Sequence, residues 1–179
     1  NGNTLDTFGG TSATSTDVDR GGTVSWTQTP PFAMAFSLDG ELVVTLYAAQ
    51  NEGRAGDATV TLTYDGTTIG SATVPIDRGN TIQPYTFVIT PSVTSIPDGQ
   101  SITLIYTSEK RTTIWYDSSL YDSRIDMTTT TYVNVDMVST HNATTVLPQS
   151  TFSAGEEVLI WANVSDPFGS QDISGANII

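Results

Sequence analysis

The stretch Ala58-Thr-Val-Thr-Leu-Thr-Tyr64-Asp-Gly66 decides the fold of this 179-residue chain. Apolar side chains alternate with threonines, and a period of two puts the apolar ones on one face of a β-strand. Asp65-Gly66 is a typical two-residue hairpin turn, and 69–76 reads as the returning strand. Pro75 indicates that this strand ends there or lies at a sheet edge. The stretch therefore predicts a β-hairpin with one buried face.

The same alternation recurs on both sides of this hairpin, whereas no window shows the apolar spacing of an amphipathic helix. Ile96-Pro-Asp-Gly99 is a well-formed turn, and 101–108 is expected to pair with 112–116 through Glu109-Lys110. Further strands are predicted at 23–27, 32–38, 41–49, 81–90 and 128–138. Short strands divided by frequent turns are typical of an all-β protein, here a jelly-roll or Greek-key antiparallel β-sandwich.

Changes in composition suggest three parts. Residues 1–22 are rich in Gly, Thr, Ser and Asp and are expected to form an extended N-terminal arm. Residues 23–140 hold the predicted sandwich. Residues 141–179 read as a linker followed by an additional Ig-like β segment, which is partial because an Ig domain needs about 100 residues. This segment is completed by the first sandwich, by further residues or by another chain.

Charge excludes two classes of partner. The formal net charge is −13 and the sequence pI is about 4.1, with only six Lys and Arg residues. Such a chain cannot form the basic patch that nucleic acid or an anionic membrane requires. No apolar run has the length of a membrane-spanning helix.

Other features favour an extracellular, cell-surface location. The sequence starts with Asn1 instead of Met, contains no Cys, and is poor in Lys and rich in Thr. Two Asn-X-Ser/Thr sequons, at Asn142 and Asn163, are N-glycosylation acceptors in a secreted protein. We therefore predict a secreted glycoprotein.

Three segments together resemble large secreted archaeal and bacterial cell-surface proteins. Trp26-Thr-Gln-Thr-Pro-Pro-Phe32 with 38–47, and Tyr116-Asp-Ser-Ser-Leu-Tyr-Asp-Ser-Arg124, resemble parts of their jelly-roll domains. Phe152 to Ile179, including Asp-Pro-Phe-Gly169, resembles the start of the Ig-like repeats that follow those domains. The resemblance implies a cell-surface or extracellular-matrix setting and a carbohydrate-module-like fold, and it carries over no catalytic residues.

The residues that commonly carry catalysis are scarce. His141 is the single histidine, it falls in the expected linker, and no Gly-X-Ser-X-Gly elbow exists. The carboxylates cluster at turns, where Asp commonly caps backbone amides. An enzyme is therefore not predicted.

Two kinds of binding site remain candidates. Calcium is the most plausible ion, and Asp117 and Asp122 in one loop, with Asp17 and Asp19, are its candidate ligands. No other cofactor is expected. All three Trp residues lie in strand patterns and are expected in the core, so Tyr116 and Tyr121 are the better candidates for stacking on a glycan.

These features predict a structural surface protein: a subunit or module of an S-layer, pilus or filament, assembled by β-strand addition. The candidate donor strands centre on Leu5 and Phe8, and on Val158 and Ile160. Expected partners are further copies of the chain, neighbouring surface-protein domains or polysaccharide. The alternative function is a carbohydrate-binding module of a secreted multidomain protein.

Overall fold

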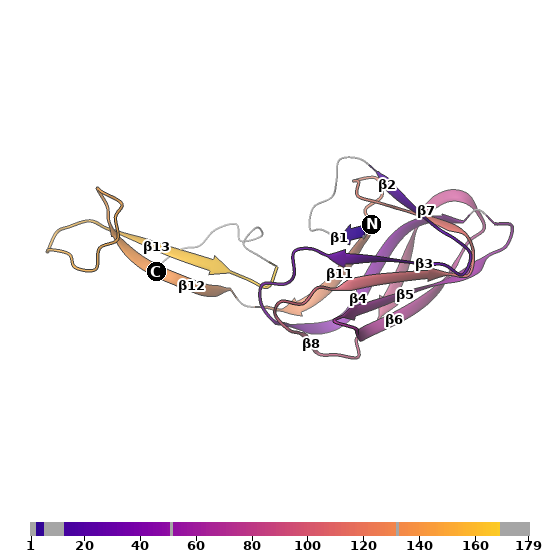
Figure 1. Ribbon diagram of the computed structural model, residues 1–179, viewed down its shortest axis with the longest axis horizontal. Coiled ribbons are helices and arrows are strands. Elements are labelled where there is room, and N and C mark those ends of the chain that lie inside the picture. Colours follow the sequence, from indigo (N-terminus) through magenta and orange to yellow (C-terminus); the bar gives the residue numbers. More distant parts are fainter. Residues whose placement is uncertain (1–2, 6–12, 51, 132, 169–179) are drawn as a thin grey trace.

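The computed structural model describes residues 3–5, 13–50, 52–131 and 133–168, and these contain strands and no helix (Figure 1). No helix in this part of the chain could cross a membrane. The strands are β1 (Asn3–Leu5), β2 (Thr14–Val18), β3 (Thr23–Gln28), β4 (Phe36–Gln50), β5 (Gly56–Tyr64), β6 (Thr67–Ile76), β7 (Gly79–Ile89), β8 (Ser95–Ile96), β9 (Thr103–Ser108), β10 (Thr112–Tyr116), β11 (Arg124–Thr130), β12 (Asn134–Asn142) and β13 (Val158–Ser165). The chain is an all-β sandwich, as predicted.

The first sheet contains the predicted hairpin. Its order is β1-β3-β9-β5-β6, and the neighbours are antiparallel except for the parallel pair β1–β3. Asp65 and Gly66 join β5 to β6 with φ values of 43° and 74°. Both residues of this turn need a positive φ, which Asp and Gly tolerate better than most residues.

The second sheet is built on β4, which is 15 residues long. β7 and β8 pair with one edge of β4, β11 and β10 pair with the other edge, and β2 pairs with the far side of β10. The predicted hairpin between 101–108 and 112–116 is therefore wrong. β9 lies in the first sheet and β10 in the second, because Glu109–Arg111 carry the chain across the edge of the sandwich.

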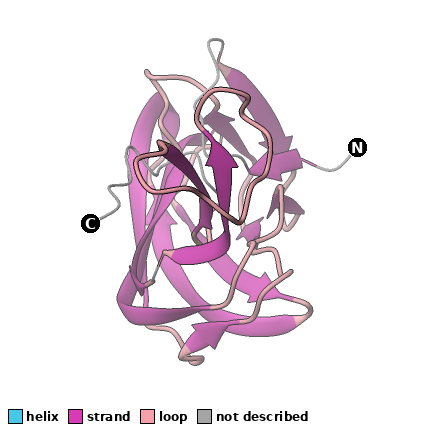
Figure 2. Ribbon diagram, turned by 90° about the vertical axis from the view of Figure 1, so that its left-hand side faces the viewer, coloured by secondary structure: helices cyan, strands magenta, loops and turns pink. Residues whose placement is uncertain are grey.

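The core lies between the two sheets (Figure 2). Alternation decides its members, since every second side chain of a strand points inward. The fully buried apolar side chains include Leu42, Val44, Val60, Leu62, Ile69, Phe87, Ile89, Leu104, Tyr106 and Ile114. Outward positions of the first sheet carry threonines instead, and cross-strand hydroxyl pairs such as Thr59–Thr73 join them at 2.8 Å.

Both ends of the sandwich differ from the expected strand pattern. Thr14–Val18, expected in an extended arm, is an edge strand of the second sheet. The expected strand at 128–138 is divided: β11 ends at Thr130 and pairs with β4, whereas β12 pairs with β13 alone. The expected domain boundaries at residues 22 and 140 stay predictions. However, β2 precedes the first boundary and pairs with the sandwich, and β12 begins before the second boundary and pairs with β13 alone.

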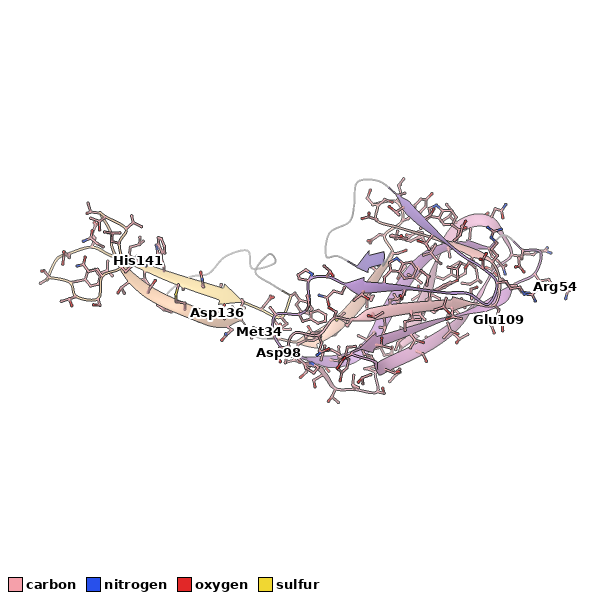
Figure 3. All side chains as sticks on the ribbon, in the orientation of Figure 1. Met34, Arg54, Asp98, Glu109, Asp136 and His141 are labelled. Carbon is pink, nitrogen blue, oxygen red and sulfur yellow. The ribbon has the colours of Figure 1, made fainter. Side chains whose placement is uncertain are left out.

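The hairpin β12–β13 projects from one end of the sandwich (Figure 1). Figure 3 shows His141 near its far end and Met34 where it joins the sandwich. The joint is apolar: Phe168 packs against Phe32 and Phe36 with ring centroids 5.7 and 5.3 Å apart. In addition, the Ala33 amide donates a hydrogen bond of 3.0 Å to the Pro167 carbonyl. The Asp-Pro-Phe segment thus anchors the hairpin to the sandwich.

Candidate functional site

Three half-buried rings form what we call the aromatic shelf: Tyr47, Trp115 and Tyr121 on the outer side of the second sheet. Trp115 of β10 lies opposite Tyr47 of β4. Tyr121 comes from the loop after β10 and lies 5.8 Å from Tyr47 and 6.3 Å from Trp115, centroid to centroid. The shelf thus joins two strands and a loop.

The loop from Asp117 to Ser123 is held in place by short polar contacts. The Ser123 hydroxyl donates to the Trp115 carbonyl at 2.7 Å and accepts from the Tyr47 amide at 2.9 Å. Asp117 has a positive φ of 66°, and the Tyr121 amide donates to the Ser118 carbonyl at 3.1 Å. These bonds fix Tyr121 beside the other two rings.

An exposed ion-pair cluster borders the shelf. Arg124 of β11 donates from Nη1 to Asp122 at 2.8 Å and from Nε to Asp126 at 2.9 Å. The hydrogen bond to Asp126 is the main reason that the pKa of Arg124 is raised further above its ordinary value. Arg124 therefore stays charged and neutralises part of the acidic cluster.

The exposed large apolar residues of the sandwich lie on this face and in the loop that carries Tyr121. Among the described residues of the two sandwich sheets and their loops these are Val88 and Leu120, which are 49% and 77% exposed. Val88 points outward from β7, because Phe87 and Ile89 point into the core, and Leu120 precedes Tyr121 in the loop. The threonine-lined outer face of the first sheet has no counterpart to this cluster within the described residues.

The predicted calcium ligands lie in two places. Asp122 pairs with Arg124, while Asp17 accepts a hydrogen bond of 2.6 Å from Thr113. Asp17 and Asp19 each lie 3.9 Å from Arg111. Within the described ranges no three acidic or histidine side chains converge as a metal site. The calcium site stays a prediction.

The two candidate stacking tyrosines point to opposite sides of their sheet. Tyr116 packs edge-on against Trp26 at 5.6 Å, and its hydroxyl is 2.9 Å from Thr16. It lies on the inner side, whereas Trp115 and Tyr121 lie on the outer side. Sequence reasoning missed Tyr47 and Trp115, because both stand in runs of apolar residues that indicate no facing direction. Of the three Trp residues, only Trp26 is buried, at 3% exposure.

His141 lies in β12, not in the expected linker, and is buried. Its Nδ1 is 3.1 Å from the Val146 carbonyl oxygen, and its Nε2 is 2.9 Å from the Ser139 hydroxyl. Because a carbonyl only accepts, the neutral ring carries its proton on Nδ1, and Ser139 donates to Nε2. The ring also stacks on Trp161 at 4.3 Å. This cluster holds the tip of the hairpin together.

The remaining predicted residues lie apart from the shelf. Leu5 belongs to β1, and Phe8 lies outside the described residues. Val158 and Ile160 belong to β13 and pair with β12 of the same chain. The last part of the expected Ig-like segment, residues 169–179, also lies outside the described residues.

No known family model matches the sequence. Among solved structures, the chain resembles a CocE/NonD family hydrolase from Staphylococcus aureus with a TM-score of 0.58 and 14% identity, covering 71% of this chain and 34% of the hydrolase. It also resembles an aminopeptidase from a marine sediment Thaumarchaeota archaeon, with a TM-score of 0.53 and 11% identity, covering 60% of this chain and 26% of the aminopeptidase. A third similar structure is an α-amino acid ester hydrolase, with a TM-score of 0.51 and 13% identity, covering 60% of this chain and 25% of the ester hydrolase.

These matches concern the fold, and the chain spans about a third of the length of the staphylococcal hydrolase. They support the β-sandwich part of the expected resemblance but give no link to cell-surface proteins. The predicted function, an S-layer, pilus or filament subunit with a carbohydrate-binding module as its alternative, is therefore corrected. The similar structures named above are a CocE/NonD family hydrolase, an aminopeptidase and an α-amino acid ester hydrolase, and none of them is a structural or adhesive surface protein.

Proposed function

We propose that this chain is a β-sandwich domain of a larger hydrolase and is not the catalytic unit itself. The observation that carries the proposal is the fold: a sandwich of this kind makes up about a third of a CocE/NonD family hydrolase and a quarter of an α-amino acid ester hydrolase. The catalytic unit lies on the same polypeptide or on a bound one. The extracellular location expected from the sequence remains part of the proposal.

The outer face of the second sheet is the surface that contacts the catalytic unit. The aromatic shelf and Val88 give it an apolar centre, Leu120 lies in the adjoining loop, and Arg124 with its two carboxylates gives it a polar rim. A mixed surface of this kind is typical of the contacts between domains of one protein. The threonine-lined face of the first sheet is suited to water instead.

Activity measurements test the assignment. Protein isolated from its source with an antibody against this chain should hydrolyse p-nitrophenyl esters or aminoacyl p-nitroanilides, and the isolated chain should not. A native sample without such activity would overturn the proposal. Activity of the isolated chain that is lost in Ser139→Ala would overturn the noncatalytic role, because Ser139 contacts the one histidine.

Site-specific crosslinking tests the contact surface. Benzoylphenylalanine placed at Val88 or Leu120 in the source organism should crosslink to the polypeptide that carries hydrolase activity. Thr61 on β5, which points outward from the threonine-lined face, is the matched control position and should give no crosslink. Equal crosslinking from both faces would contradict the proposed surface.

A further inference from the structure

One face of the hairpin β12–β13 gathers aromatic, sulfur-containing and amide side chains. The register places His141 opposite Leu159, Ser139 opposite Trp161, and Met137 opposite Asn163. Because side chains of a strand alternate between faces, residues 159, 161, 163 and 165 share this face. We call it the sequon face, since Asn163-Val-Ser165 lies along it.

Trp161 presents an open aromatic surface on the sequon face. Its ring stacks on His141 at an interplanar angle of 28°, which covers one side of the indole. Trp161 nevertheless remains 47% exposed, and Met137 in the neighbouring row is 50% exposed. An indole and a thioether in adjacent rows are apolar surface without a covering element in the described part of the chain.

Asn163 lies beside this open surface. It is exposed and stands two residues after Trp161, so both side chains leave the strand on the same side. His141 occupies the tip side of the indole, and Asn163 and Met137 form the next row toward the sandwich. A group attached to the Asn163 amide would therefore lie over the uncovered side of Trp161.

The second sequon has a different environment. Asn142 is half-buried, and its Oδ1 accepts hydrogen bonds of 2.9 Å from the amides of both Thr144 and Thr145. Its backbone amide and carbonyl also bond to Leu147 and Val146 in the tip loop. Asn142 closes the loop and has no exposed aromatic ring two residues before it in the strand.

We propose that Asn163 is an N-glycosylation site whose first sugar packs on Trp161 and Met137 and covers the sequon face. The donor is an oligosaccharide linked to a polyisoprenyl diphosphate. The Asn163 amide nitrogen loses a proton and bonds to C1 of the sugar, the bond from C1 to the phosphate oxygen breaks, and the polyisoprenyl diphosphate leaves. A glycan is bulky and hydrophilic on its outer side, so it replaces exposed apolar surface by a solvated one.

The modification has to precede folding of the hairpin base. Ser165, which completes the sequon, lies 3.7 Å from the Met34 sulfur, hydroxyl oxygen to Sδ. It is only half-exposed where the hairpin joins the sandwich. A transferase that must read the Ser165 hydroxyl therefore acts before this contact forms.

Secretion of the full chain from a yeast that N-glycosylates tests the proposal. We expect a glycan on Asn163 by peptide mapping, kept in Asn142→Gln and lost in both Asn163→Gln and Ser165→Ala. After enzymatic trimming to one N-acetylglucosamine, amide hydrogen exchange of β12 and β13 should be slower than in Asn163→Gln. An unoccupied Asn163 would overturn the site.

The role of Trp161 has its own control. In Trp161→Leu the glycan on Asn163 should still be attached, but removing it should no longer change the exchange rates of β12 and β13. Because each variant is compared with and without its sugar, a hairpin weakened by the substitution does not obscure the result. Equal protection by the sugar in both proteins would overturn the stacking contact.

Discussion

The sandwich and the hairpin β12–β13 are both built from alternating strands, yet they treat apolar side chains in opposite ways. In the sandwich, Val60, Phe87 and Leu104 are at most 1% exposed, because a second sheet covers each inner face. In the hairpin, Val138, Ile160 and Trp161 are 44–60% exposed. An isolated two-stranded ribbon is only marginally stable in water, so the stability of the hairpin depends on the contacts at its two ends. Burial stabilises the first region, and attachment stabilises the second.

Removing a core ring should have the largest effect. Phe87→Ala leaves a cavity between the sheets and should lower the free energy of unfolding by about 3–5 kcal/mol. Val88→Ala is the matched control, since Val88 is the next residue of β7 and points outward, and it should cost about 0.5 kcal/mol or less. Denaturant unfolding followed by Trp fluorescence measures both. Similar losses would mean that the two faces of β7 are not distinguished by burial.

Removing the anchor should separate the two regions. Phe168→Ala deletes the partly buried ring that packs on Phe32 and Phe36. This loss should lower the free energy that holds the hairpin on the sandwich by about 1–2 kcal/mol. Hydrogen exchange should accelerate in β12 and β13 while the strands of the sandwich stay protected. Leu147→Ala, which truncates an exposed residue of the hairpin tip, is the control and should leave exchange at the joint unchanged.

A pH effect should be confined to the sandwich. Burial raises the pKa of Tyr106 above its ordinary value of 10.0, so the folded chain keeps a proton that the unfolded chain releases. The contribution of the Tyr106 hydroxyl to folding stability is fully present below pH 10, and it is lost as the pH rises through the higher pKa of the folded state. Tyr106→Phe should flatten this alkaline loss in stability measurements at pH 9 and 11.

The same variant has a smaller effect at neutral pH. The Tyr106 hydroxyl donates to Thr112 at 3.2 Å, and losing this bond should cost about 1 kcal/mol. If the alkaline loss is as steep in Tyr106→Phe as in the parent chain, another group is responsible for it.

The smallest effect is expected at the hairpin tip. His141→Ala removes the ring that joins Ser139, Val146 and Trp161, and should lower the stability of the tip by about 1 kcal/mol. Exchange should accelerate near Val146 and Leu159, and the unfolding midpoint of the sandwich should not move. A shift of that midpoint would show that the tip and the sandwich unfold as one unit.

Local patterns predicted the sandwich well where the pattern and the turn agreed. The alternation before Asp65-Gly66 defines one buried face and a turn that demands positive φ, so β5 and β6 followed directly. The strand at 112–116 was also predicted, but its partner was not. Neighbouring strands usually pair, and nothing in Glu109-Lys110 indicates that the chain crosses to the opposite sheet there.

The candidate site was predicted only in part, for a similar reason. Asp122 and Tyr121 were recognised because they follow a strand in a polar loop. Tyr47 and Trp115 were not, because each lies in an apolar run, and only the packing of the second sheet shows which residues face outward. Tyr116, one residue away from Trp115, faces the inner side of that sheet and packs on Trp26, so it lies apart from Tyr121.

By itself, the sequence determined that this chain forms strands, where most of them lie and which side chains their inner faces share, because alternation and turn residues act over a few neighbours. Tertiary structure alone decided which strands pair, that the aromatic shelf lies outside the core, and that Phe168 ties the hairpin to the sandwich. Those outcomes depend on contacts between residues far apart in the chain, and such contacts leave no local pattern to read. The strand at 58–64 could be predicted from neighbouring residues in the sequence, whereas the attachment of the hairpin β12–β13 depends on its contacts with the sandwich.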